Sequence, residues 1–130
     1  MTPELLKFYT ALQPLFRERM GEWRVGDFYR CPECGTKMYC GEAEACIHAF
    51  SSTKDKCVWI PKLSDPIQPE RGLMGLVKNE PSLFYRFFDR LWICETYSND
   101  HQRTGLFDGS TPEIAVAKAV IVQEERHADN

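Results

Sequence analysis

Residues 57–61 read Cys57-Val58-Trp59-Ile60-Pro61, a short aromatic and β-branched run that ends at a proline. Branched and aromatic side chains pack well on a pleated surface, and proline cannot continue a hydrogen-bonded ladder. We therefore predict a strand over residues 56–63. Residues 23–30 have a similar composition and predict a second strand.

The segment between these two strands holds five of the six cysteines of the chain. If the strands pair antiparallel, Cys31 and Cys57 come together at the mouth of the intervening loop. The loop opens with Cys31-Pro32-Glu33-Cys34-Gly35, in which Pro32 sets one backbone angle and Gly35 permits a positive one. This turn directs two thiolates to one point and predicts half of a zinc site.

The other half of the zinc site has several candidates. We expect the metal ligands to be Cys31, Cys34, Cys46 and Cys57, with Cys40 and His48 left open as replacements for Cys46. A structural zinc at this point would offset the entropy of closing a loop of roughly 25 residues, a cost of several kcal/mol. The alternative is that these residues are ordinary reduced thiols.

Two helices are predicted at the ends of the sequence. Thr2-Pro3-Glu4 and Thr111-Pro112-Glu113 are both helix starts, in which Thr caps free amides, Pro occupies the first helical position and Glu complements the dipole. In the first helix Pro14 is expected to cause a kink or a restart, and Gly21 to end the helix. Apolar residues at helical spacing are Leu5, Leu6, Phe8, Tyr9, Leu12, Leu15, Phe16 and Met20 in the first helix and Ile114, Ala117, Val120 and Ile121 in the second.

The middle of the chain is less regular. Residues 64–72 predict a proline-punctuated loop. Residues 73–77 and 82–89 are compatible with short helical turns, and the period of residues 84–88 leaves both helix and strand open. Residues 91–97 predict a third strand, in which Cys94 is a core residue, and residues 98–109 predict a polar loop. We expect the aromatic residues Phe84, Tyr85, Phe87, Phe88 and Trp92 to lie in the core.

These elements predict an α+β fold: a small antiparallel sheet packed with N- and C-terminal helices, carrying a cysteine-rich, zinc-knuckle-like insertion. At 130 residues with 43% hydrophobic residues, the chain fits one domain spanning residues 1–130, with the insertion at residues 31–57. The net charge is −3, and the basic residues form no run along the sequence, which disfavours nucleic acid as a partner.

The first residues, Met1-Thr2-Pro3-Glu4, show no secretory signal, so we expect a soluble cytoplasmic protein with reduced cysteines. No apolar run reaches the roughly 20 residues that span a bilayer, and no membrane partner is expected.

Four short motifs occur in a recognisable order: residues 23–27 (WRVGD), 58–61 (VWIP), 65–73 (DPIQPERGL) and 111–115 (TPEIA). This order resembles small phage- or prophage-encoded proteins of uncharacterised function. In those proteins the first two motifs are usually joined by a shorter link without a cysteine cluster, so residues 31–55 would be an elaboration of this chain. The resemblance implies no functional residues.

The sequence contains no recognisable catalytic constellation, so we expect a non-enzymatic accessory or protein-interaction domain with a structural zinc site. The alternative is a zinc-dependent nucleic-acid-binding module, suggested by the knuckle and by basic residues around the loop. These are Arg30, Lys37, Lys54, Lys56 and Lys62.

Overall fold

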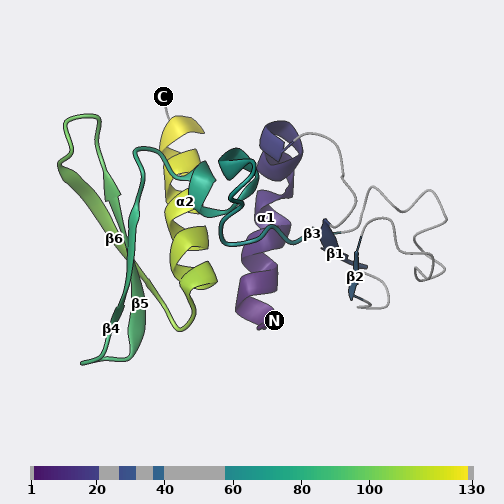
Figure 1. The fold of residues 1–130 in the computed structure, drawn as a ribbon, viewed down its shortest axis with the longest axis horizontal. Coiled ribbons are helices and arrows are strands. Elements are labelled where there is room, and N and C mark those ends of the chain that lie inside the picture. Colours follow the sequence, from purple (N-terminus) through teal and green to yellow (C-terminus); the bar gives the residue numbers. More distant parts are fainter. Residues whose placement is uncertain (1, 21–26, 32–36, 40–57, 129–130) are drawn as a thin grey trace. The chain divides into compact units, whose positions relative to one another are not determined.

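The computed structural model describes residues 2–20, 27–31, 37–39 and 58–128. The helices and strands in these ranges are α1 (Pro3–Met20), β1 (Phe28–Arg30), β2 (Lys37–Tyr39), β3 (Val58–Trp59), β4 (Ser82–Arg86), β5 (Leu91–Tyr97), β6 (Arg103–Gly109) and α2 (Pro112–Ala128), with short 3-10 helices η3 (Pro69–Arg71) and η4 (Met74–Leu76). The predicted α+β class, with two α-helices and small antiparallel sheets in the described residues, is confirmed (Figure 1).

The chain divides into two compact units, Met1–Phe8 with Lys62–Asn130 and Tyr9–Pro61, so the boundary falls within α1. Each unit holds one three-stranded antiparallel sheet of its own. The sequence predicted one sheet, and the described residues form two, because β4 and β6 were not recognised as strands. The proposal of a single domain over residues 1–130 stays a prediction.

The sheet of residues 9–61 has the order β2-β1-β3. Strand β1 pairs antiparallel with β3, with Tyr29 opposite Trp59 and Arg30 opposite Val58, and this is the pairing that the predicted zinc site requires. Its other neighbour is β2, a strand that the sequence reading did not anticipate. The burial of Tyr29, Val58 and Trp59 is nearly complete, at 5%, 7% and 3% exposure. Aromatic and branched residues therefore build this sheet, as their strand propensity indicates.

Helix α1 is tied to β3 by the side chain of Gln13. Its Oε1 accepts a hydrogen bond from the Trp59 amide at 2.9 Å, and its Nε2 donates to the Trp59 carbonyl at 2.9 Å and to the Tyr9 carbonyl at 2.9 Å. Gln13 is only 9% exposed, between buried turns of the helix. The amide thus satisfies both backbone groups of Trp59, as a neighbouring strand would.

Local signals start both helices where the sequence predicted. Thr2 Oγ1 accepts from the Leu5 amide at 3.2 Å, and Thr111 Oγ1 accepts from the Ile114 amide at 3.3 Å, so both predicted N-caps are confirmed. α1 continues through Pro14 as one helix and does not restart there. Gly21 lies outside the described residues.

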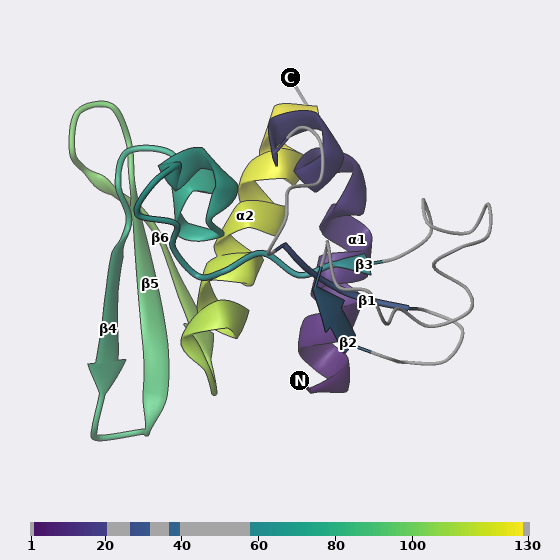
Figure 2. The ribbon, with the colours of Figure 1, turned by 45° about the vertical axis from the view of Figure 1, so that its right-hand side comes forward.

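The sheet of residues 62–130 has the order β4-β5-β6, and α2 packs on β5 and β6 (Figures 1 and 2). The β5 prediction over residues 91–97 is confirmed. Buried residues of this part of the chain include Leu73, Val77, Ile93, Cys94, Ile114, Ala115, Val116, Ala117, Ala119 and Val120. Of the four positions that the sequence assigned to the apolar side of α2, Ile121 alone is only partly buried.

The segment that precedes β4, residues 65–75, is stabilised by local hydrogen bonds. Asp65 Oδ1 accepts from the amides of Ile67 at 3.0 Å and Gln68 at 3.1 Å, which starts the turn into η3. A Cβ at Gly75 would lie 1.8 Å from the Pro69 carbonyl oxygen, so only glycine fits where η4 meets η3. Leu73 is fully buried below this turn.

The structure resolves one open alternative in this region and shows that one prediction is wrong. Residues 82–86 form strand β4 and not a helical turn, because the register of Tyr85 with Trp92 in β5 decides a period that the short apolar run leaves open. Residues 103–109 form strand β6 instead of a loop. The polar turn is confined to residues 98–102, where the Ser98 amide donates to the Gln102 carbonyl at 2.8 Å.

Replacing Gln13 with Leu tests the link between α1 and β3. The variant removes the hydrogen bonds that Gln13 makes with the buried Trp59 amide and carbonyl, and we expect it to lower the free energy of unfolding by about 2–4 kcal/mol. Glu18→Leu, an exposed change on the same helix, is the control and should alter stability by less than about 0.5 kcal/mol. Urea unfolding measures both, and equal effects of the two changes would contradict the role assigned to Gln13.

Candidate functional site

Cys31 is the one predicted zinc ligand within the described residues. It follows β1 directly and is 1% exposed. Cys31 and Cys94 are both free thiols in the part of the chain that the structure describes. The position of Cys31 at the end of β1, one residue after the Arg30–Val58 pair, is the position that the antiparallel pairing required.

The other predicted ligands, Cys34, Cys46 and Cys57, and the alternatives Cys40 and His48, lie outside the described residues. Within residues 2–20, 27–31, 37–39 and 58–128, no group of three or more His, Cys, Asp or Glu side chains is arranged to hold a metal ion. The zinc site therefore stays a prediction from the sequence.

The largest departure from expectation is the turn between β4 and β5. The sequence reading placed the aromatic residues of this region in the core, and that prediction is wrong for four of them. Phe84 and Tyr85 are 41% and 38% exposed, and Phe87 and Phe88 are 85% and 90% exposed. Phe87 and Phe88, which we call the aromatic tip, occupy the turn itself.

The aromatic tip is supported by a row of rings behind it. The Tyr85 ring lies 5.4 Å from Trp92 and 5.2 Å from Phe87, the latter in an edge-on arrangement. Such contacts are favourable beyond simple area burial. Phe87 is therefore held in place on one side while its remaining surface faces solvent, which is the form that an anchor residue takes in an interface.

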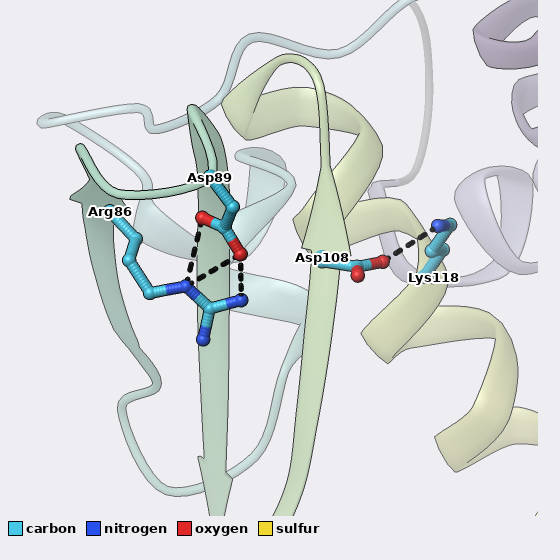
Figure 3. Close-up of polar contacts among 4 residues, drawn as sticks. All are labelled: Arg86, Asp89, Asp108 and Lys118. Atoms are coloured by element: carbon cyan, nitrogen blue, oxygen red, sulfur yellow. Dashed lines mark hydrogen bonds and ion pairs between the residues drawn. The ribbon is translucent and has the colours of Figure 1, made fainter.

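An ion pair closes the same turn. Arg86 Nε donates to both oxygens of Asp89 at 2.9 Å, and Arg86 Nη2 also contacts Asp89 Oδ2 (Figure 3). The hydrogen bonds from Arg86 hold the pKa of the Asp89 carboxyl below its ordinary value, so Asp89 is ionised at neutral pH. Arg90 has a positive φ of 56° after this turn and forms no ion pair among the described residues.

Figure 3 also shows a second ion pair, which joins β6 to α2: Lys118 Nζ lies 3.2 Å from Asp108 Oδ1. This contact is exposed and lies at the strand farthest from β4. The aromatic tip is thus carried by a hairpin whose base is part of a sheet that is packed and paired.

A pocket lies at the opposite end of the sheet from the aromatic tip. It has a volume of about 360 Å³ and is lined by Asn79, Glu80, Tyr97 and His101. Asn79 Nδ2 donates to the Tyr97 carbonyl at 2.9 Å, and the Tyr97 hydroxyl is hydrogen-bonded to Glu95 Oε2 at 2.6 Å and to Ser82 Oγ at 2.8 Å. The pocket has a carboxylate, from Glu80, and an imidazole, from His101, and the Tyr97 hydroxyl beside them is hydrogen-bonded to the Glu95 carboxylate.

Three of the four pocket residues have a positive φ: 62° at Asn79, 47° at Glu80 and 62° at His101. Each lies in a turn that carries a strand into or out of the sheet. Asn is often found in this backbone region, whereas Glu is not. The shape of the pocket therefore depends on the backbone of two segments, the one before β4 and the turn between β5 and β6.

Sequence reasoning missed the aromatic tip because apolar residues are assigned to the core by default. One signal was present: Phe87 and Phe88 are bounded on both sides by charged residues, Arg86 and Asp89-Arg90. If Phe87 and Phe88 were buried, the chain would have to return the neighbouring charged side chains to solvent within one residue, or bury them at a large cost in free energy. Cys94, in contrast, is fully buried as predicted, and burial raises the pKa of its thiol from 9.0 to about 11.

The buried Cys94 thiol should make stability depend on pH. Between pH 9 and about 11 the unfolded chain releases this proton and the native chain retains it, so the free energy of unfolding falls as the pH rises. Urea unfolding of the wild type and of Cys94→Ala across this range isolates the contribution, because other groups titrate equally in both. We expect a steeper decline in the wild type, and parallel profiles would contradict it.

No family model, curated protein or solved structure matches this chain. Within the described residues, no helix combines the length and apolar character needed to cross a membrane.

Proposed function

We propose that this protein is a non-enzymatic interaction domain that docks a protein partner through the aromatic tip. The observation that carries the proposal is the exposure of Phe87 and Phe88, at 85% and 90%, in a chain whose other described aromatic residues are far better covered. Leaving two Phe side chains in water forgoes about 2 kcal/mol of burial for each. Adjacent exposed aromatic anchors on a supported turn mark an interaction site.

The chemistry of the turn indicates what the partner surface must offer. Arg86 and Asp89 neutralise each other, which leaves Arg90 as the net charge next to the aromatic tip. A complementary partner has an apolar cleft that takes the two rings and an acidic group at its rim. The rest of the hairpin, held in the sheet, provides a rigid base, so little order has to be gained on binding.

The Phe87→Ser/Phe88→Ser double variant tests the aromatic tip. Because both side chains are exposed, we expect the free energy of unfolding to change by less than about 1 kcal/mol, whereas partner affinity falls roughly 100-fold or more. The partner is identified by placing a photo-crosslinking phenylalanine analogue at position 88, and the affinity is then measured with the purified partner.

Position 67 is the matched control, because Ile67 is 84% exposed in a loop of the same unit. Crosslinking from position 88 but not from position 67 supports the proposal. Strong destabilisation of the double variant would show that Phe87 and Phe88 stabilise the fold and would contradict the proposed docking role. If the wild type sediments with anionic vesicles and the double variant does not, the tip binds a lipid surface and the proposed protein partner is wrong.

The second candidate is a module for single-stranded nucleic acid, since exposed rings beside arginines can stack on bases. Two observations weigh against it: Arg86 is already engaged by Asp89, and the chain has a net charge of −3. A salt titration of binding to generic DNA and RNA decides the matter. A steep loss of affinity with salt supports nucleic acid, and no binding at low salt removes it.

We also propose that a structural zinc ion held by Cys31, Cys34, Cys46 and Cys57 closes the cysteine-rich segment. Support comes from the knuckle sequence and from the register that pairs Arg30 with Val58. Cys31 follows Arg30 and Cys57 precedes Val58 in the sequence. Because consecutive Cα atoms are about 3.8 Å apart, each cysteine is bonded directly to a member of that pair. This ion would act on the loop and leave the aromatic tip unchanged.

Elemental analysis of reduced protein, purified without added metal, should find about one equivalent of zinc. Cys31→Ser should release it, and chelation should increase hydrogen exchange in residues 31–55 while β5 and α2 stay protected. Cys94→Ser is the control, because Cys94 is fully buried in a different unit. The absence of any transition metal from the wild type would leave the cysteines as ordinary thiols.

A further inference from the structure

Strand β4 is an open edge of its sheet. The order is β4-β5-β6, so one side of β4 pairs with β5, and among the described residues no strand pairs with the other side (Figure 2). In an antiparallel sheet every second residue of an edge strand directs its N–H and C=O groups away from the sheet. Ser82, Phe84 and Tyr85 are exposed along this edge.

The two edges of this sheet differ in how they are protected. The opposite edge, β6, carries Arg103 and Asp108, and its pairing with β5 is interrupted by an irregularity between Thr96 and Tyr97. Charges and bulges of this kind prevent edge strands from pairing with other chains. β4 has five regular pairs with β5 and one charged residue, Arg86, at its end.

The sequence of β4 is complementary to itself in an antiparallel pairing. With two copies centred on Phe84, Leu83 of each copy lies opposite Tyr85 of the other, and Ser82 lies opposite Arg86. Apolar residues therefore meet apolar residues, and no like charges face each other, which would be unfavourable in a cross-strand pair. A twofold axis through Phe84 generates this pairing from one surface patch.

We propose that two copies of this chain associate through β4, paired antiparallel about Phe84, so that their two sheets become one. The interaction goes beyond the proposed docking function, because it uses the strand edge and not the turn. It also gives that function a geometry. Antiparallel pairing places the two aromatic tips at opposite ends of the joined sheet, so one dimer presents two docking sites to a partner.

Sedimentation velocity over a wide range of protein concentration tests the proposal. The wild type should form a dimer as the concentration rises. In Phe84→Lys, two lysines face each other across the axis, and the dissociation constant should increase at least about tenfold. Leu106→Lys is the matched control and should still dimerise.

Leu106 is a close match because it is 48% exposed, against 41% for Phe84, and lies on the other edge strand. It is also on the same face of the sheet: Leu106 and Ser82 both pair with Glu95, and Ser82 shares a face with Phe84. The Phe87→Ser/Phe88→Ser variant should dimerise as well, so that failure of the docking function and failure of this pairing give different results.

Hydrogen exchange of the wild type provides a measurement that needs no variant. Amides of residues 82–86 should exchange more slowly as the concentration rises, while those of residues 103–109 stay unchanged. A wild type that is monomeric at every concentration would overturn the proposal. So would equal effects of Phe84→Lys and Leu106→Lys, or protection of β4 that appears only when a different protein is added.

Discussion

The hydrogen bonds between the Gln13 side chain and the Trp59 backbone are the constraint on which the cysteine-bearing half of the molecule depends. β3 is 2 residues long and has β1 as its strand neighbour. A strand this short cannot hold its position by ladder bonds alone. Gln13 supplies a donor and an acceptor, both at 2.9 Å, from a helix turn that is already buried. The amide therefore replaces a further strand and fixes β3 against α1.

The consequence extends to Cys31. The pairing of Arg30 with Val58 follows from the position of β3, and Cys31 is the residue directly after β1. Its exposure of 1% shows that the end of this small sheet is covered. A metal ligand at that place is held by the sheet, whereas ligands within the loop would depend on the metal. The proposed zinc site would therefore start from a ligand whose position the strand pairing sets.

The β4-β5-β6 sheet follows a different logic. Its central strand, β5, is buried at Ile93 and Cys94. Helix α2 packs on β5 and β6, so the core of this sheet lies between these two strands and α2. The outer strand β4 and its turn take little part in that core and carry the exposed aromatic residues. Their exposure leaves the buried residues of β5 and α2 covered. An open edge and an aromatic tip are thus two surfaces available for association on one hairpin.

The part of the fold that follows from local chemistry could be predicted. Thr2 and Thr111 cap helices because a hydroxyl three residues upstream reaches a free amide in any context. The strand at residues 91–97 and the stop at Pro61 follow from composition in the same way. The candidate zinc ligands were also named from the sequence, by the geometry of the knuckle, and three of the four lie outside the described residues.

The sequence alone determined the α+β class, the helix starts and the burial of Cys94. Only the tertiary structure decided that residues 82–86 are a strand, that residues 103–109 continue the sheet, and that Phe87 and Phe88 face solvent. The physical reason is that a short apolar run fits both a helical and an extended period. The choice, and with it the side that is buried, comes from the register with a distant strand, which no local pattern contains.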